Sequence, residues 1–377
     1  MKVIFSHSTV QNYREALIKE LVNKLPNLKI VLTSKNKSIN DNFIEINKFK
    51  NIESYKSYSV LLYNNFSFSL LKHALIDKYD VWISSMLNSY STHFVFLISK
   101  IRRKKFIIFT EDWYNVKSVR FGLINWYNQI ILNNVDALVV ASSASREYFL
   151  NRGVPDEKIF VALNSTENLS LRRKKTNRFE YINEITDLKI LFMNRLEEVK
   201  GLDVLLKAIK IVQDSNRIIS LFIAGSGSME KDYKVLADKL KLTNVYFIGK
   251  VPNNEIHDLI KEVDIYVHSG KVIRDSKASQ EAWGFTINEV ISLNKPIISS
   301  DSVAASRDLI SENINGMIFE ESNYTELSEK IKEFSDLPKE EQRKMGANNK
   351  FIIDKITGKS QAEKFIDSLN YVEKNEN

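Results

Sequence analysis

Short apolar runs, each followed by a segment with helical spacing, recur along this chain and limit its fold more than any other feature. In the first half these runs stand at 2–6, 28–33, 80–84, 105–110 and 137–142. The segment 12–25, between the first two runs, places its apolar residues at helical spacing. Strands that are apolar without alternation are buried on both faces, as in a parallel sheet covered by helices. The pattern predicts an α/β fold.

The second half repeats this rhythm after a polar interruption. Its apolar runs stand at 189–193, 219–224, 245–248, 264–268 and 296–300. The interruption is polar and contains the basic run 171–178. We therefore predict a first domain over 1–165, a basic linker over 166–187 and a second domain over 188–350. The remainder, 351–377, is predicted to form a C-terminal helix that packs back on the first domain.

Composition narrows the functional classes. The chain has 377 residues and no cysteine, which excludes disulfides and thiolate metal sites. Its five histidines do not stand at metal-ligand spacing, so no metal is expected. The N-terminal apolar run is too short for a signal peptide and no stretch approaches 18 apolar residues, so we expect a cytoplasmic protein. The net charge of +7 suits an anionic partner or reflects a solvated surface rich in lysine and asparagine.

Two strand-to-helix loops carry phosphate-binding chemistry. Arg195 and Lys200 flank a loop that opens a helix at Gly201, where two cations and free N–H groups can hold a diphosphate. As an isolated pair they are also common surface charges. Gly225 and Gly227 let the backbone approach a ligand closely. The third glycine of a dinucleotide fingerprint and the Walker-type Lys-Ser/Thr are both missing, which disfavours a nicotinamide cofactor and ATP hydrolysis.

The stretch 281–289 joins two carboxylates to a tight turn. Glu281 and Glu289 bracket Trp283-Gly284-Phe285, and a helical run follows. A turn at Gly284 would leave the N–H groups of that helix facing a ligand. A carboxylate directly before the turn can accept hydrogen bonds from sugar hydroxyls. We predict a sugar-phosphate site here.

Taken together, these loops resemble family 4 of the retaining glycosyltransferases. The matching residues are Arg195-Leu196 with Lys200-Gly201, Ala224-Gly225-Ser226-Gly227, Val245-Tyr246-Phe247-Ile248-Gly249, Asp264-Ile265-Tyr266-Val267-His268-Ser269, Glu281 with Glu289, Lys295-Pro296-Ile297-Ile298 and Asn315-Gly316. The match covers about 189–334, whereas the first half agrees only in rhythm and at Asn164. The resemblance implies the GT-B fold, with two Rossmann-like domains whose parallel sheets face each other across a cleft. The first domain would bind the acceptor and the second the nucleotide-sugar donor.

The resemblance also assigns roles. Arg195 and Lys200 would hold the diphosphate and stabilise the leaving group, and Glu281 would receive hydroxyls of the donor sugar, so these three form the catalytic set. Glu289 would bind the ribose hydroxyls. The implied donor-binding residues are Gly225, Gly227, Gly249, Lys250, Val251, Gly284, Phe285, Thr286 and Glu289. No metal or resident cofactor is implied, because the nucleotide sugar is a substrate.

Several positions depart from the family pattern. Asn194 stands where a glycine is usual, and 270–280 is longer than usual. Glu111-Asp112 occupy the place of a His-Asp pair, so either carboxylate is a candidate acceptor-side base or sugar ligand, or a solvated loop residue. Arg14 follows the first strand and is a candidate for holding an anionic acceptor group.

The sequence therefore predicts a metal-independent, retaining glycosyltransferase. It would move a hexosyl or N-acetylhexosaminyl group from a UDP-sugar to a glycan or lipid-linked glycan in surface polysaccharide or glycolipid biosynthesis. A nucleotide-sugar 2-epimerase of the same fold and a non-enzymatic basic protein that binds membranes or polyanions are the alternatives. The basic cluster 102–105 with nearby aromatics (Trp113, Tyr114, Phe121, Trp126 and Tyr127) suggests peripheral contact with the anionic inner face of the cell membrane. No nucleic-acid partner is expected.

Overall fold

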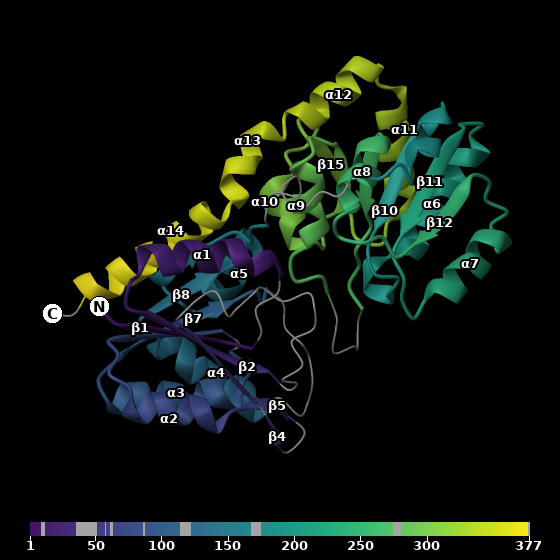
Figure 1. The fold of residues 1–377 in the computed structure, drawn as a ribbon. Helices are drawn as coiled ribbons and strands as arrows, with labels where there is room; N and C mark the ends of the chain where they lie inside the picture. The colour runs from purple at the N-terminus through teal and green to yellow at the C-terminus, as the bar shows by residue number, and fades with distance from the viewer. Residues whose placement is uncertain are drawn as a thin grey trace. The chain divides into compact units, whose positions relative to one another are not determined.

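The chain folds into two compact units. The structure, a computed structural model, describes residues 1–8, 12–34, 51–56, 58–60, 63–85, 87–113, 122–166, 175–273 and 280–375. The first unit comprises Met1–Glu167 together with Lys355–Asn377, and the second comprises Asn168–Asp354 (Figure 1). Each unit is described by itself below.

The first unit is built on a seven-stranded sheet with the order β3-β2-β1-β6-β7-β8-β9. All of its pairings are parallel. Its strands are β1 (Val3–His7), β2 (Leu28–Ser34), β3 (Ile52–Lys56), β6 (Val81–Ser85), β7 (Lys105–Thr110), β8 (Ala137–Val140) and β9 (Ile159–Val161). A separate antiparallel hairpin consists of β4 (Tyr58–Val60) and β5 (Tyr63–Phe66).

Helices cover both faces of this sheet, as the apolar strands require. They are α1 (Glu15–Lys24), α2 (Phe68–Ile76), α3 (Tyr90–Ile101), α4 (Gly122–Asn134), α5 (Ser143–Leu150) and α14 (Gly358–Lys374). Successive residues of β1 point to opposite faces. Phe5 joins a core cluster with residues of α1 and α14, whereas Ile4 joins a second cluster with residues of α2, α3 and α4.

The C-terminal helix α14 belongs to the first unit although it follows the second in sequence (Figure 1). A capping box between Thr357 and Ser360 starts the helix. Its Phe365 ring packs against the rings of Phe5 and Phe109 at centroid distances of 5.8 and 5.0 Å. The helix therefore completes the core on one face of the first sheet.

The second unit is built on a six-stranded parallel sheet with the order β12-β11-β10-β13-β14-β15. Its strands are β10 (Leu188–Met193), β11 (Ile219–Ala224), β12 (Val245–Gly249), β13 (Ile265–His268), β14 (Ile297–Ser300) and β15 (Gly316–Phe319). Its helices are α6 (Leu202–Asp214), α7 (Glu230–Lys239), α8 (Ile256–Glu262), α9 (Phe285–Ile291), α10 (Ala304–Leu309), α11 (Tyr324–Asp336), α12 (Lys339–Ala347) and α13 (Lys350–Ile353).

The strand order of the second sheet reverses between β10 and β13. The chain runs outward from β10 through β11 to β12, and then returns to β13 on the other side of β10. Loops diverge at such a reversal and leave a crevice beyond the carboxyl ends of the strands, where ligands bind in open α/β sheets. The loops that follow β10 and β13 are therefore the first place to look for a site.

These parallel sheets and covering helices confirm the predicted α/β class with two Rossmann-like domains. The sequence also predicts strands within 41–50 and 57–63. The structure has β4 within the second range, in the antiparallel hairpin and not in the main sheet, and 41–50 lies outside the described residues. In the described part of the chain, no helix is long and apolar enough to span a bilayer.

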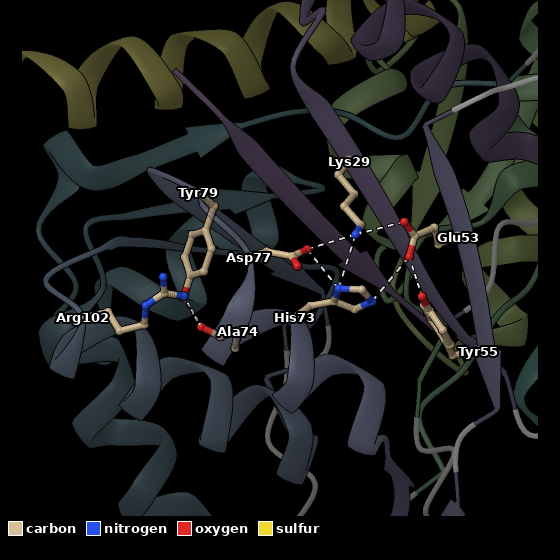
Figure 2. Close-up of polar contacts among 8 residues, drawn as sticks. All are labelled: Lys29, Glu53, Tyr55, His73, Ala74, Asp77, Tyr79 and Arg102. Carbon is tan, nitrogen blue, oxygen red and sulfur yellow. Dashed lines mark hydrogen bonds and ion pairs between the residues drawn. The ribbon is translucent and has the colours of Figure 1, made fainter.

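A charged cluster fastens α2 to the sheet of the first unit (Figure 2). Lys29 lies 2.9 Å from both Glu53 and Asp77, and His73 bonds the same Asp77 oxygen at 2.9 Å. Burial alone would raise the pKa values of Glu53 and Asp77, but the hydrogen bonds that each accepts, from Tyr55 and Lys29 and from Lys29 and His73 respectively, hold both below their ordinary values.

Lys29→Met should destabilise the protein by about 1–2 kcal/mol at pH 7, because both carboxylates lose their cation. Carboxyl groups with depressed pKa values contribute stability above their unfolded pKa values and lose it as the pH falls. The difference between variant and wild type should therefore shrink below about pH 4. Denaturant unfolding as a function of pH measures this. Lys210→Met, which removes an exposed pair with Asp214, is the control and should cost less than about 0.5 kcal/mol.

Candidate functional site

The residues predicted to bind the donor lie at the carboxyl ends of adjacent strands in the second unit. Arg195 and Lys200 follow β10, and Gly225 with Gly227 follows β11. Gly249 ends β12, and Glu281 lies between β13 and α9. Because β12, β11, β10 and β13 are neighbours in the sheet, these loops share one edge.

An ion pair between Lys200 and Glu281 lies at the reversal of strand order. It joins the loop after β10 to the loop after β13, and the two side chains are only 11% and 15% exposed. Burial, and then the nearby charge of Arg195, lower the pKa of Lys200 to about 7. The Glu281 carboxylate acts in the opposite direction and favours the ammonium form. Arg195 itself is exposed, so it places a solvent-accessible cation near the largely buried Lys200–Glu281 pair.

His268 ends β13 beside this ion pair. Burial and the charge of Lys200 lower the pKa of its imidazole to about 3, which keeps the ring neutral. The Gly270 N–H donates to Nδ1 at 3.2 Å, so the proton lies on Nε2. The structure gives the buried Nε2 no hydrogen-bond partner in the described part of the chain. The sequence had offered His268 only as part of a strand motif.

A buried polar network ties the end of β10 to α9. Asn194 donates to the Tyr266 hydroxyl at 2.9 Å, and Tyr266 donates to the Thr286 hydroxyl at 2.7 Å. The Thr286 hydroxyl in turn donates to the side-chain amide oxygen of Asn194, Oδ1, at 3.4 Å. The asparagine that departs from the family glycine is therefore part of a closed ring of hydrogen bonds. This ring holds Thr286, a predicted donor-binding residue, at the start of α9.

The glycines after β11 approach protein backbone rather than open space. A Cβ atom on Gly225, whose φ is +141°, would lie 1.9 Å from the Asn194 carbonyl oxygen. One on Gly227 would lie 2.4 Å from the Leu196 carbonyl oxygen. The Leu196 N–H also donates to the Ser226 carbonyl at 3.0 Å. These glycines therefore allow the first two loops to pack together and set the position of Arg195.

The turn before α9 is held from inside. Gly284 has φ +102°, which only glycine adopts readily. The Trp283 indole is buried and donates to Asn288 at 2.8 Å, one turn along the chain. The Trp283 carbonyl accepts from the Ala305 N–H at 2.9 Å. This packing fixes the spacing between Glu281 and Glu289, which stand before and within α9.

Glu289 lies on α9 with its carboxyl group largely out of water. Burial raises its pKa to about 7. The described residues supply the carboxyl group with neither an ion pair nor a hydrogen bond. A desolvated carboxylate without a partner can accept from hydroxyl groups of a ligand, and the ligand would restore the lost hydrogen bonds.

The remaining residues that were predicted to bind the donor take no part in the side-chain contacts described above. Gly249 accepts from the Gly225 N–H at 2.9 Å, Lys250 is exposed and Val251 is buried. Phe285 begins α9 and is partly exposed. Residues 274–279, most of the insertion before Glu281, lie outside the described residues.

The acceptor-side candidates meet in the first unit. Arg14 is 3% exposed, and its guanidinium pairs with Glu111 at 3.0 Å and donates to Asn164 at 3.5 Å. Asn164 also donates to Glu111. The terminal nitrogens of Arg14 contact Glu111 and Asn164, while its buried Nε has no hydrogen-bond partner among the described residues. Glu111, 27% exposed, still reaches solvent. Burial, more than any charge, raises the pKa of Asp112, which is not part of this network.

Gln361, on α14, supports the same network and had no signal in the sequence. Its side-chain amide donates to the side-chain oxygen Oδ1 of Asn164 at 3.3 Å and accepts from the Ser165 hydroxyl at 2.7 Å. The Asn164 carbonyl thus receives two donors, which turns its NH₂ group toward Glu111. Only its position in a buried stripe of the C-terminal helix could have drawn attention to Gln361.

Comparison with known proteins finds one family model and several relatives that match this chain. The model described as glycosyl transferases group 1 matches residues 173–351. An uncharacterised 41.2 kDa protein in the cps region of Klebsiella pneumoniae is 24% identical over 67% of this chain and 69% of its own length. The amylovoran biosynthesis glycosyltransferase AmsK of Erwinia amylovora is 26% identical over 52% of this chain, and the aligned part is 46% of AmsK.

Among solved structures, the Anabaena Alr3699/HepE protein in complex with UDP aligns with 98% of this chain and 100% of its own, with a TM-score of 0.75. The sequence identity is 15%, so this likeness concerns the fold. It agrees with the expected GT-B fold.

Replacing Glu289 by glutamine should stabilise the protein at alkaline pH. A carboxyl group whose folded pKa is raised to about 7 destabilises the fold increasingly as the pH rises from its unfolded value to 7. The variant should gain about 1–3 kcal/mol at pH 8 and nothing near pH 4.5. Unfolding curves across this range test it, with Glu340→Gln on the exposed face of α12 as control. A gain that did not change with pH would contradict the assignment.

Proposed function

Because residues 173–351 of this chain match the family model described as glycosyl transferases group 1, we propose that the protein is a retaining glycosyltransferase that works without a metal ion. Its donor would be a UDP-sugar carrying a hexosyl or N-acetylhexosaminyl group. Its acceptor would be a glycan or lipid-linked glycan. The reaction would serve polysaccharide or glycolipid biosynthesis.

The observation that carries this proposal is the Lys200–Glu281 pair beside Arg195, at the reversal of strand order. Sugar transfer breaks the bond between the anomeric carbon and the diphosphate, and negative charge grows on the phosphate oxygen. Two fixed cations in a poorly hydrated site stabilise that charge more strongly than water does. A diphosphate near Lys200 would also raise its pKa and so keep the ammonium group charged.

The two carboxylates of 281–289 suit the rest of the donor. Glu281 would accept from hydroxyls of the transferred sugar while it keeps Lys200 in place. Glu289 would accept from the ribose hydroxyls, which supply the donors that its carboxyl group lacks in the protein. A sugar nucleotide thus matches both groups, one on each side of the diphosphate.

On the acceptor side we assign the polar contact to Glu111. Arg14 and Asn164 hold its carboxyl group in one orientation, and its partial exposure leaves oxygen lone pairs for a hydroxyl group. The carboxylate could accept the proton of an attacking hydroxyl, or position that hydroxyl. The internal pairing of Arg14 makes it a support for Glu111 rather than a ligand for an anionic acceptor.

Relatives support the donor and acceptor classes. The Alr3699/HepE structure contains UDP, which supports uracil as the base of the donor nucleotide. AmsK is a glycosyltransferase of amylovoran biosynthesis, which supports a glycan acceptor. Metal independence rests on the donor chemistry proposed for Arg195 and Lys200, and retention rests on the resemblance to family 4 of the retaining glycosyltransferases.

The test is thermal unfolding of the full chain with UDP, GDP, ADP or CMP, in the presence of EDTA. We expect UDP to stabilise the protein, by about 2.7 kcal/mol at a hundredfold excess over its Kd. Lys200→Ala should abolish most of this shift, because it removes a phosphate-binding cation. Lys207→Ala, on the exposed face of α6, is the matched control and should bind as the wild type does.

Product analysis separates transfer from epimerisation. With UDP-glucose, UDP-galactose or UDP-N-acetylglucosamine and water as acceptor, NMR should show release of the sugar first as the α-anomer. Lys200→Ala should lower this turnover by roughly 10²–10³-fold. Accumulation of an isomerised nucleotide sugar, or a β-anomer released first, would contradict the proposed reaction.

A further inference from the structure

Two neighbouring helices of the first unit turn apolar stripes toward solvent. Six large apolar side chains, each at least 47% exposed, lie on them: Phe68, Leu75 and Ile76 of α2, and Phe94, Leu97 and Ile101 of α3. The three residues on each helix fall within one stripe at helical spacing. The opposite sides of the same helices, including Leu70 and Val95, are buried in the core of the unit.

These stripes form one surface. The helices α2 and α3 pack against each other and form the outer layer on one side of the first sheet (Figure 1). The Phe66 ring, at the end of β5, meets the rings of Phe68 and Phe94 at 4.8 and 6.0 Å and joins the two stripes. A contiguous exposed apolar surface of this kind marks a place where a protein or a membrane binds. We call these six residues the α2–α3 face.

Cations without carboxylate partners border the α2–α3 face. Lys72 lies within the α2 stripe, Lys78 follows α2 and Arg103 follows α3. All three are exposed, and among the described residues none of them pairs with a carboxylate. Other basic residues nearby are engaged, since Lys100 pairs with Asp136 at 2.7 Å and Lys104 with Asp80 at 3.8 Å. Arg102 donates a hydrogen bond to the Ala74 carbonyl at 2.5 Å (Figure 2).

We propose that the α2–α3 face docks on an anionic lipid surface. Phenylalanine, leucine and isoleucine side chains enter the boundary between headgroups and acyl chains, while lysine and arginine beside them meet the lipid phosphates. The uncompensated cations decide between lipid and protein: a second copy of this chain would bring the same positive charges against one another. Of the aromatic set predicted to contact a membrane, Trp113 is buried, Tyr127 donates to the His93 carbonyl at 3.4 Å and Trp126 is exposed on α4, while Tyr114 and Phe121 lie outside the described residues.

The position of the face within the first unit fits an acceptor held in a membrane. The α3 helix begins just after the carboxyl end of β6, so Phe94 lies near the sheet edge that carries Glu111 after β7. A lipid surface at the α2–α3 face would therefore meet the unit beside its polar network. Docking itself requires neither donor nor turnover, so it is tested independently of the proposed reaction.

The experiment is flotation of the full chain with vesicles of phosphatidylcholine alone or mixed with phosphatidylglycerol. We expect binding to the anionic vesicles, weakened as NaCl rises from about 0.1 to about 1 M, because the Debye length then falls from about 10 to about 3 Å. Neutralising Lys72, Lys78 and Arg103 with glutamine should lower the partition coefficient roughly a hundredfold, at about fivefold for each cation. Phe68→Ser combined with Leu97→Ser should also lower it at least tenfold.

Matched controls lie on the second unit. Phe351→Ser with Ile218→Ser removes equally exposed apolar groups, and Lys231→Gln with Lys239→Gln removes exposed lysines; both should bind as the wild type does. Unchanged thermal unfolding of every variant shows that the surface alone was altered. Lack of binding to anionic vesicles at low salt would overturn the proposal. So would binding that the control sets reduce as much, or a dimer in sedimentation that Phe68→Ser with Leu97→Ser dissociates.

Discussion

Burial of both faces of two parallel sheets is the constraint on which the rest of this structure depends. A parallel strand cannot expose a face without leaving apolar residues in water, so each strand needs helices above and below it. In the first unit, Ile4 and Phe5 show this within two residues, since they enter cores on opposite faces. The crossover helices in turn force every loop that follows a strand to the carboxyl edge of the sheet. Polar side chains of functional sites lie at this edge because the loops there leave the apolar core.

At the reversal of strand order in the second unit this geometry brings Lys200 against Glu281, 81 residues apart in sequence. The glycines after β11 and the Asn194–Tyr266–Thr286 ring are the supports that hold the surrounding loops. Burial disfavours three polar groups near this pair. Lys200 has a lowered pKa, the neutral His268 has a buried N–H without a hydrogen-bond partner among the described residues, and Glu289 has a raised pKa. Such groups concentrate where a ligand supplies what the protein withholds.

Much of this organisation could be predicted from the sequence. Continuous apolar runs identified ten of the thirteen strands described in the two sheets, because burial on both faces leaves a clear trace in composition, whereas β3, β9 and β15 were not predicted. The family resemblance pointed to Lys200 and Glu281, which the structure brings into contact. Contacts between distant segments left no local trace: the pairing of Arg14 with Glu111, the support from Gln361 and the role of Asn194 depend on tertiary packing. The hairpin was predicted only in part: β4 lies within the predicted strand range 57–63, whereas β5 and its antiparallel pairing with β4 were not predicted.

The return of α14 to the first unit also governs the order in which the protein can form. During synthesis the first sheet emerges with one face uncovered around Phe5 and Phe109, because Phe365 follows the whole second unit in the sequence. The second unit, which is continuous in sequence, is complete before that helix leaves the ribosome. Domains that are synthesised first usually fold first. Here the first unit cannot complete its core until α14 has been made, so the second unit can fold before it, and α14 closes the core beside the Arg14–Glu111 pair.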